Sequence, residues 1–340
     1  MAVPRIAVVG TGANGAAIAA DLIRGGVHDV TLIDQWPENV AALRRDGVIV
    51  RVRGHETQTP VTAINLCDVA TLRGSFDIVL LLVKAYDTAW ACELIKPLLA
   101  PDGVVAGVQN GMTIDAIARV VGLHRTVGCV IEVGGSMFTP GVVERDTPGD
   151  LSWFAVGGFG EHARKNERAV ADLLGLAGTV ELSPHIRSSK WMKLIVNAAE
   201  LVPSAILGLP LAEAVRVEGM RRFMIEAGAE AARLTEPLGL KTVPIFGVDV
   251  DATAPLRFIE TLLDKVVFEY ALPNSRTTVL QDWMKGRRSE VHEINGLVVE
   301  KAAESALAAP ANQRTVAVAS QIEAGELDAQ PSNVRLLLGD

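Results

Sequence analysis

Several residue types are scarce in this chain, and each scarcity excludes a class of protein. The three cysteines among the 340 residues, Cys67, Cys92 and Cys129, are an odd number without metal-ligand spacing, so we expect free thiols in a reducing compartment. The six histidines are scattered and never four apart, so no metal site is predicted. No apolar run approaches the ~20 residues of a membrane helix, and the N-terminus lacks a secretory leader pattern. We therefore expect a soluble, cytoplasmic protein.

Positive charge is also in short supply. The 32 Lys and Arg are outnumbered by 40 Asp and Glu, which gives a formal net charge of −8. Basic residues gather only in short pairs, such as Arg44 with Arg45 and Arg287 with Arg288, which are typical of solvated helix faces. A protein that binds nucleic acid would present a basic patch or stripe, so no nucleic-acid partner is expected.

The length of the chain is sufficient for two domains. Residues 1–183 alternate short runs rich in Val and Ile with helix-like stretches, which predicts an α/β domain with a Rossmann-type, doubly wound parallel sheet. The turn-rich piece 134–160 is typical of an antiparallel extension. The expected strands are RIAVVG, DVTLID, GVIVRV, DIVLLLV, GVVAGVQ and TVGCVIEV, and the expected helices are 13–24, 87–99 and 112–121.

Residues 184–340 show a different pattern, with apolar repeats of period 3.6 and no convincing β-branched runs. An all-α domain is therefore expected, and the cleft between two domains is the default place for a ligand site. Helical domains that bury much apolar surface often self-associate, so we expect a homodimer through this domain, with 211–232 and 255–272 as candidate surfaces. The predicted helices are 187–208, 211–236, 255–272 and 288–307.

The stretch GTGANG at 10–15 fits the dinucleotide-binding pattern G-x-G-x-x-G. It follows an apolar strand and opens an Ala-rich helix, and this context favours a nucleotide turn over an ordinary structural turn. In such a turn the first glycine bends the chain, the second admits the pyrophosphate and the third packs the helix on the strand. The helix N-terminus adds N–H groups for the anion. The expected cofactor contacts are Gly10, Gly12, Ala13, Asn14 and Gly15.

A second strand ends in Asp34, 24 residues after Gly10. A carboxylate at this position accepts hydrogen bonds from the ribose hydroxyls of NAD and repels the 2′-phosphate of NADP. An NADP site usually carries an arginine nearby, and Arg44 and Arg45 lie farther along the chain, from where they can in principle reach back. The sequence therefore predicts NAD rather than NADP.

Polar side chains follow two later strands of the predicted sheet. Lys84 ends the run DIVLLLVK, and Asn110 follows GVVAGVQ just before Gly111. Both lie at the carboxyl edge of the sheet, where open α/β sheets bind ligands. A lysine at a strand end is also typical of a solvated surface, and Asn-Gly of a plain turn. Each residue is thus a candidate with an ordinary alternative.

The predicted helix 187–208 carries a polar stripe. Lys193 and Asn197 lie one turn apart on the same face, with Lys190 and Glu200 close to it. Such a stripe on an otherwise apolar helix faces either solvent or a lined cleft. A surface helix with polar i, i+4 pairs is the plain alternative. Asparagine is a poor residue for a helix interior, which favours the cleft.

Two more positions stand out near the C-terminus. Glu290 precedes an apolar-periodic helix, where an acid also serves simply to complement the helix dipole. Pro310 marks the start of another helix and places Asn312 in its first turn.

Several motifs now fall in order along the chain: G-x-G-x-x-G, a strand-end Lys followed by Ala and an aromatic, NGM, K-W-x-K-L-x-x-N, S-E-x-x-x-I-N-G and P-x-N. Together they resemble the ketopantoate reductase (2-dehydropantoate 2-reductase) family, over roughly residues 5–316. The resemblance implies an N-terminal Rossmann domain and a helical C-terminal domain. It also implies reduction of a 2-oxo acid to a 2-hydroxy acid with a nicotinamide cofactor.

The same resemblance implies roles for individual residues. Lys193 corresponds to a general acid that protonates the carbonyl oxygen, and Glu290 to an acid that contacts the substrate hydroxyl and orients the lysine. Asn110 and Asn197 correspond to amides that position the substrate. The other implied site residues are Lys84 as a cation on the cofactor or substrate side and Thr278 as a hydroxyl near the substrate carboxylate. Glu200, close to the polar stripe, is a further candidate for the substrate side.

Three positions depart from the family pattern. Val202 precedes Pro203 where the family has N-P-L-T, and His292 stands where an Asp follows the family's Glu. Asp34 stands where well-known members carry an Arg that favours NADP. The departures predict altered substrate contacts with retained chemistry, and they leave open whether Glu200 or His292 enters the pocket.

The leading hypothesis is an NAD(H)-dependent oxidoreductase that interconverts a 2-oxo acid and a 2-hydroxy acid, with Lys193 as general acid and base. One alternative is a catabolic NAD-dependent dehydrogenase of a D-2-hydroxy acid or another secondary alcohol, because an excess of NAD⁺ over NADH drives oxidation. A non-catalytic NAD(H)-binding sensor would have no use for the lysine, asparagines and glutamate together. Methyl transfer would leave the lysine and glutamate unexplained.

Overall fold

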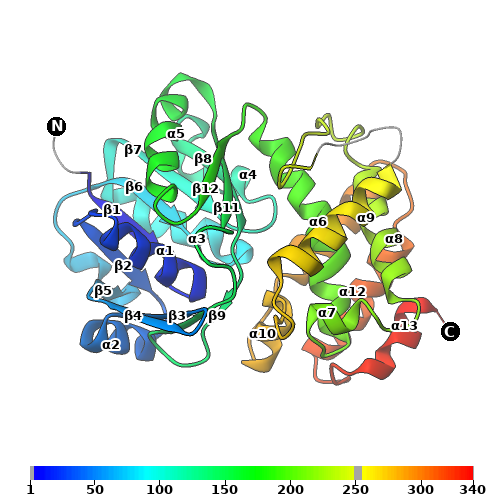
Figure 1. Cartoon of the computed structure of the whole chain (residues 1–340). Coiled ribbons are helices and arrows are strands. Elements are labelled where there is room, and N and C mark those ends of the chain that lie inside the picture. Colours follow the sequence, from blue (N-terminus) through cyan, green and yellow to red (C-terminus); the bar gives the residue numbers. More distant parts are fainter. Residues whose placement is uncertain (1–3, 249–254, 340) are drawn as a thin grey trace. The chain divides into compact units, whose positions relative to one another are not determined.

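The computed structural model of the chain describes residues 4–248 and 255–339 (Figure 1). The chain forms two compact units, Met1–Ile186 and Arg187–Asp340. The first unit contains two sheets with helices packed on them, and the described part of the second unit consists of helices joined by turns and loops.

The main sheet of the first unit has eight strands in the order β12-β11-β8-β7-β6-β1-β2-β5. All neighbouring pairs run parallel except β8 and β11, which are antiparallel. This arrangement confirms the predicted α/β fold with a doubly wound sheet. The strands are β1 (Ile6–Val9), β2 (Val30–Asp34), β5 (Thr62–Asn65), β6 (Phe76–Leu81), β7 (Leu99–Val108), β8 (Thr126–Glu132), β11 (Trp153–Gly158) and β12 (Thr179–Leu182).

Helices cover both faces of this sheet, so its strands are apolar on both sides. Ile6 and Val8 of β1 belong to one core, shared with helices α1, α2 and α5. Ala7 and Val9 belong to the opposite core, shared with α3 and α4. Alternate side chains of β1 therefore pack into the two cores on opposite faces of the sheet. The helices are α1 (Ala13–Arg24), α2 (Pro37–Asp46), α3 (Thr88–Ile95), α4 (Ile114–Val121) and α5 (Gly160–Leu174).

The prediction that GVIVRV joins the parallel sheet is wrong. This run forms β3 (Val48–Val52) in a second sheet of order β4-β3-β10-β9, with β4 at His55–Thr59, β10 at Val142–Arg145 and β9 at Gly135–Ser136. Arg53 and Gly54, with φ of +49° and +77°, fold the chain back into an antiparallel hairpin directly after β3. The antiparallel extension is confirmed for β11, whereas β9 and β10 belong to the second sheet.

The helices of the second unit are shorter than predicted. The segment 211–236 is interrupted before Gly219, whose φ of +82° is outside the helical region, and 255–272 and 288–307 each contain a π-helical turn. The elements are α6 (Ile186–Ile206), α7 (Leu211–Ala214), α8 (Met220–Ala232), α9 (Pro255–Lys265), a π turn (Val266–Tyr270), α10 (Thr278–Met284), a π turn (His292–Gly296), α11 (Leu297–Glu304), α12 (Pro310–Glu323) and α13 (Val334–Leu338).

The long helix α6 continues through Pro203. Proline lacks the N–H of a regular helix turn, so backbone carbonyls near it need other donors. Asn295 Nδ2 donates to the carbonyl of Ala198 at 2.9 Å, and Thr277 Oγ1 donates to the carbonyl of Leu201 at 2.9 Å. Neighbouring segments of the second unit thus supply hydrogen bonds to two α6 carbonyls in the turns that precede Pro203.

A buried polar network connects these helices. Glu230 on α8, with 2% of its surface exposed, accepts hydrogen bonds from the backbone N–H groups of Ala311 and Asn312 at 2.8 and 2.9 Å. Asn312 Nδ2 donates to the same carboxylate at 2.7 Å, and Asn312 Oδ1 accepts from Asn295 Nδ2 at 2.8 Å. A carboxylate at the N-terminus of α12 is favoured by the helix dipole as well. The network therefore ties α8, α12 and the second π turn to α6.

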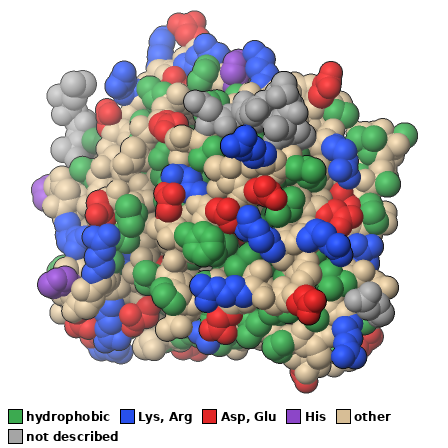
Figure 2. Space-filling view, turned by 45° about the vertical axis from the view of Figure 1, so that its right-hand side comes forward, with side chains coloured by type: hydrophobic (Ala, Val, Ile, Leu, Met, Phe, Trp, Pro, Cys, Tyr) green, Lys and Arg blue, Asp and Glu red, His purple; other side chains and the backbone are tan. Residues whose placement is uncertain are grey.

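The surface of the molecule carries charges of both signs. On the face drawn in Figure 2, basic and acidic side chains are interspersed. No helix in the described ranges is both long and apolar enough to span a membrane.

Of the three cysteines, Cys67 is exposed, whereas Cys92 and Cys129 are buried, and all three are free thiols. Burial raises the pKa of the Cys92 thiol to about 12, so this thiol stays protonated and unreactive at neutral pH.

The Glu230 network yields a stability prediction. Glu230→Ala leaves buried N–H donors without an acceptor, so we expect the free energy of unfolding to fall by about 3 kcal/mol. Urea denaturation followed by circular dichroism measures the change. Glu236→Ala, which removes an exposed glutamate of the same unit, should stay within about 0.5 kcal/mol of the parent. Equal effects of the two substitutions would contradict the role of the network.

Candidate functional site

The glycine turn lies between two parallel strands of the main sheet. Gly10 follows β1 with φ of +90°, and a Cβ placed on it would approach Val83 N, at the end of β6, to 2.6 Å. A Cβ on Gly15 would collide with the carbonyl oxygen of Gly10. A Cβ on Gly12 would meet nothing within 4 Å. Gly10 and Gly15 are thus required by packing, while Gly12 borders open space.

This open space has the properties of an anion site. Gly12 is the N-cap of α1 and makes no side-chain capping hydrogen bond, so its helix presents N–H groups at the turn. Asn14 Nδ2 donates to the carbonyl of Val133 at 3.2 Å, which anchors the first turn of α1 to the end of β8. The position, between β1 and β6, is the point where strand order reverses and where such sheets bind dinucleotides. The residues present therefore fit a nicotinamide dinucleotide.

Asp34, at the end of β2, is 7% exposed and already hydrogen-bonded within the chain. Its Oδ2 accepts from Thr11 N at 2.8 Å, from Thr11 Oγ1 at 2.5 Å and from Asn39 Nδ2 at 3.3 Å. Its Oδ1 accepts from Trp36 N at 2.8 Å. The carboxylate thus fixes the glycine turn against the start of α2. It also places one negative charge at the ribose end of the predicted cofactor site.

Lys84 and Asn110 lie where the sequence places them, after β6 and β7, and both are half-buried. Gln109, next to Asn110, donates from Nε2 to the carbonyl of Val83 at 2.7 Å and to Thr88 Oγ1 at 3.0 Å. This side chain bridges the carboxyl ends of the two strands. The edge that carries Gly10, Lys84 and Asn110 is therefore held together by Gln109, which the sequence analysis did not single out.

The polar stripe of α6 is not solvated. The exposed fractions are 3% for Lys190, 7% for Lys193, 0% for Asn197 and 2% for Glu200, as low as those of the apolar residues between them. The alternative of a surface helix is therefore wrong. Charged side chains are buried only where they are paired or used, because desolvation of a charge is costly. The stripe has the character of a functional site rather than of a solvated face.

The segment that carries Glu290 is fixed against α6 and α12. Ser289, the preceding residue, donates from its N–H and its hydroxyl to Glu323 Oε1 at 3.0 and 2.6 Å. Asn295, five residues after Glu290, binds the carbonyl of Ala198, next to Asn197 on α6. Glu290 itself is 4% exposed. Two anchors thus hold a buried carboxylate segment beside the helix that carries Lys193.

Three other predicted positions have different surroundings. His292 is exposed, whereas Glu200 is buried, so of the two only Glu200 lies in the interior. Thr278 is half-buried at the start of α10, and the threonine that donates to α6 is its neighbour Thr277. In the described residues, no group of three His, Cys, Asp or Glu side chains is arranged to hold a metal ion.

Phe246 is a neighbour of Lys193 that the sequence analysis missed. Its ring centroid lies 5.1 Å from Lys193 Nζ, within the range of a cation–π contact. Its φ is +55°, which for a bulky residue costs about 1–2 kcal/mol. The only sequence signal is the Phe-Gly pair at 246–247, and a hairpin turn there would ordinarily be marked by Asn-Gly.

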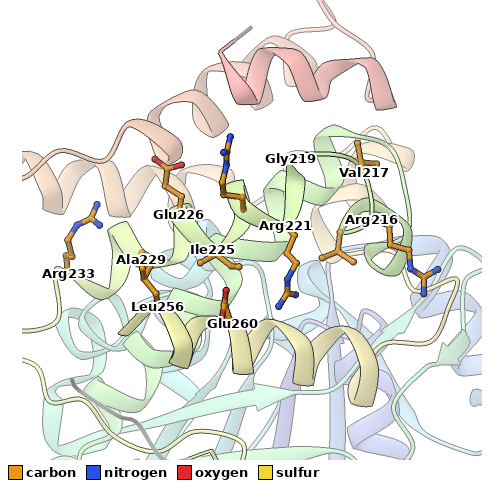
Figure 3. Close-up of a pocket in the computed structure, with 12 residues that line it drawn as sticks. Arg216, Val217, Gly219, Arg221, Ile225, Glu226, Ala229, Arg233, Leu256 and Glu260 are labelled. Carbon is orange, nitrogen blue, oxygen red and sulfur yellow. The ribbon is translucent and has the colours of Figure 1, made fainter. Parts of the chain in front are cut away.

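A separate hollow lies on the second unit, away from the α6 stripe residues. It encloses about 760 Å³, and Figure 3 shows side chains of α8 and α9 lining it. Arg221 forms a two-point ion pair with Asp264 at 2.5 and 3.1 Å. Ile225 and the exposed Leu256 supply apolar surface. The lining also contains exposed charges of both signs, namely Arg216, Arg222, Arg233, Glu226 and Glu260.

Comparison with known proteins gives consistent matches over both units. The family model described as "Ketopantoate reductase PanE/ApbA" matches residues 6–156, and the one described as "Ketopantoate reductase PanE/ApbA C terminal" matches residues 185–323. A similar curated protein is the 2-dehydropantoate 2-reductase of Lactococcus lactis subsp. lactis. It is 26% identical over 318 residues, which cover 90% of this chain and 94% of that protein.

Solved structures give the same picture. A PanE/ApbA family ketopantoate reductase from Ralstonia eutropha JMP134 aligns with a TM-score of 0.79 and 27% identity, covering 95% of this chain and 99% of that one. D-mandelate dehydrogenase in complex with NADH and anilino(oxo)acetate aligns with a TM-score of 0.82 and 20% identity, covering 94% and 99%. At 20% identity the second likeness concerns the fold alone.

The glycine geometry predicts that one alanine substitution lowers dinucleotide affinity and another lowers stability. Gly12→Ala adds a methyl group in open space, so stability should change by less than about 0.5 kcal/mol. Dinucleotide affinity should fall about 10-fold or more, a loss of about 1.4 kcal/mol of binding. Gly15→Ala collides with Gly10, so we expect it to lower stability by about 1–3 kcal/mol. Denaturation curves and NADH fluorescence titrations measure both. Unchanged affinity in Gly12→Ala would show that this space is not the dinucleotide site.

Proposed function

The chain belongs to the ketopantoate reductase family, and we therefore propose that it is a cytoplasmic oxidoreductase that interconverts a 2-oxo acid and a 2-hydroxy acid with a nicotinamide cofactor. The observation that carries the proposal is the buried Lys193 on α6, together with the buried Asn197 one turn away and the anchored Glu290 segment. A sensor that only binds a dinucleotide has no need for such a buried set of charges.

The proposed chemistry assigns one role to each part of the chain. The glycine turn would hold the pyrophosphate of the dinucleotide, whose reduced nicotinamide would supply a hydride to C2 of the oxo acid. Lys193 Nζ donates the proton that the carbonyl oxygen needs, and in the reverse direction it accepts the proton from the hydroxyl. Glu290 and Asn197 hold the lysine and the substrate oxygen, and burial keeps water away from the proton transfer.

The remaining proposed contacts are the other site residues predicted from the sequence. Asn110 and Lys84 act from the carboxyl edge of the main sheet, on the substrate and on the cofactor. Thr278 and Glu200 act from the second unit on the substrate side. The proposed cofactor contacts in the glycine turn are Gly10, Gly12, Ala13, Asn14 and Gly15.

We propose NAD as the cofactor because Asp34 places a carboxylate at the ribose end of the site. The 2′-phosphate of NADP would meet this charge, which four hydrogen bonds hold in place. The D-mandelate dehydrogenase of similar fold was solved with NADH. Use of NAD also supports a second candidate function, namely oxidation of a D-2-hydroxy acid with a bulkier side chain than that of pantoate.

We propose that the chain forms a homodimer through the hollow between α8 and α9. A two-fold interface brings the same patch of each copy together, so a patch that carries both charge signs complements itself. The lining offers exposed arginines and glutamates around Ile225 and Leu256, with Leu256 56% exposed. Arg and apolar side chains are enriched at interfaces.

The first experiment follows absorbance of the reduced nicotinamide with ketopantoate and with a panel of branched and aromatic 2-oxo acids. Lys193→Ala should lower kcat by about 10²- to 10⁴-fold, because a general acid contributes this much. NADH affinity should be unchanged, because Lys193 belongs to the second unit and the glycine turn to the first.

The matched control is Lys241→Ala, which removes an exposed lysine of the same unit and should retain full activity. Turnover of ketopantoate would identify the substrate side chain directly, whereas turnover of bulkier oxo acids alone would support the second candidate. Full activity of Lys193→Ala would overturn the proposed mechanism.

The cofactor proposal predicts that the parent enzyme has a higher kcat/KM with NADH than with NADPH. Asp34→Asn removes the charge that opposes the 2′-phosphate, so the ratio of the two kcat/KM values should fall about 10-fold or more, equivalent to about 1.4 kcal/mol. Steady-state kinetics with both cofactors provides the test. A parent enzyme that prefers NADPH would contradict the assigned role of Asp34.

The dimer proposal predicts a particle of twice the 36.1 kDa chain mass. Ile225→Asp places a charge at the centre of the proposed interface and should yield monomers, because an unpaired buried charge is strongly disfavoured. Leu123→Asp, at an exposed leucine of the first unit, should leave the mass unchanged. Light scattering after size exclusion measures the mass, and a monomeric parent protein would refute the interface.

A further inference from the structure

A two-residue turn in the second unit is built in an unusual way. Ile245 and Val248 exchange backbone hydrogen bonds, N to O at 3.2 Å and at 2.9 Å in the return direction. The two residues between them, Phe246 and Gly247, both have positive φ, +55° and +68°. Positive φ at both central positions is the pattern of a type I′ turn, which favours Asn or Gly at its first position.

Phe246 differs from the other residues with this backbone. Among described residues other than glycine, positive φ occurs at Arg53, Phe246 and Ala306. Arg53 and Ala306 are exposed, whereas Phe246 is 3% exposed. A strained backbone persists only where the surrounding structure holds it, and such strain gathers at functional sites. The strain here serves to place an aromatic ring in the interior.

The ring of Phe246 contacts two partners. One face meets Lys193, whose Nζ is 5.1 Å from the ring centroid. Tyr270 packs against the same ring, with centroids 5.6 Å apart and planes inclined by 53°. An ammonium on a four-carbon stem adopts many rotamers unless its head is held. The aromatic face attracts the cation and so restricts where Nζ lies.

We propose that Phe246 is a positioning residue for the reaction, in which a strained turn holds an aromatic face against the Lys193 ammonium and fixes the direction of proton delivery. The inference rests on the proposed role of Lys193 as general acid and base. Tyr270 packs against the same ring and helps to hold it in place. No contact between Phe246 and substrate is required, because the effect passes through the lysine.

The test compares two buried phenylalanines. Phe246→Leu keeps apolar volume but removes the aromatic face, so kcat should fall about 10-fold, as expected for a misplaced catalytic group. The solvent deuterium isotope effect on kcat should rise, because proton transfer becomes more limiting, while NADH affinity stays unchanged. Phe246→Tyr keeps the face and should retain kcat within about 2-fold.

Phe258→Leu, on α9, is the control for loss of a buried ring without a described cation–π contact, since Phe258 is 5% exposed. It should lower thermal stability and leave kcat and the isotope effect unchanged. Equal kinetic effects of Phe246→Leu and Phe258→Leu, or full activity of Phe246→Leu, would overturn the positioning role while leaving the proposed function intact. Full activity of Lys193→Ala would instead overturn the proposed function.

A spectroscopic readout is independent of turnover. In protein labelled with ¹³C at lysine Cε, the ring current of Phe246 should shift the Lys193 ε-CH₂ proton resonances upfield, and loss of the signal in Lys193→Arg assigns them. The shift should disappear in Phe246→Leu and persist in Phe246→Tyr and Phe258→Leu. An unshifted Lys193 signal in the parent protein would refute the contact itself.

Discussion

The hydrogen bond from Asn295 Nδ2 to the carbonyl of Ala198 joins the two segments of the second unit that carry Lys193 and Glu290. Ala198 follows Asn197 on α6, and Asn295 lies in the π turn His292–Gly296, which follows Glu290. The bond is completely buried, so either partner left alone would lose hydrogen bonding that water cannot restore. The position of the carboxylate segment relative to the lysine helix is thus set by the side-chain amide of Asn295.

This amide is in turn oriented by charge. Asn312 accepts from Asn295 because its own Nδ2 is engaged by Glu230 and by the carbonyl of Ala227. Glu230 is buried but satisfied, since three donors surround it at a helix N-terminus. The P-x-N and I-N-G motifs therefore have a physical meaning apart from catalysis. They build the polar scaffold that holds α8, α12 and the second π turn against α6.

In the first unit, Asp34 combines a proposed role in cofactor binding with a structural one. Asp34, which we propose presents a charge to the ribose end of the cofactor site, also ties Thr11 to the start of α2. The sequence predicted the charge from its distance to Gly10, but not the internal hydrogen bonds. Phe246 was not predicted at all, because its importance lies in a backbone conformation and a ring contact with a residue 53 positions earlier. β3 was misplaced because strand periodicity does not specify which partner a strand selects.

Local patterns by themselves determined the α/β unit, the helical unit, the glycine turn and the one-turn spacing of Lys193 and Asn197, since each depends on neighbours within a few residues. Only the tertiary structure decided that the α6 stripe is buried, that His292 is exposed, and that Asn295 meets Ala198 across 97 residues. The physical reason is that burial and hydrogen-bond partners depend on which distant segments pack together. A local periodic pattern does not specify which segment that is.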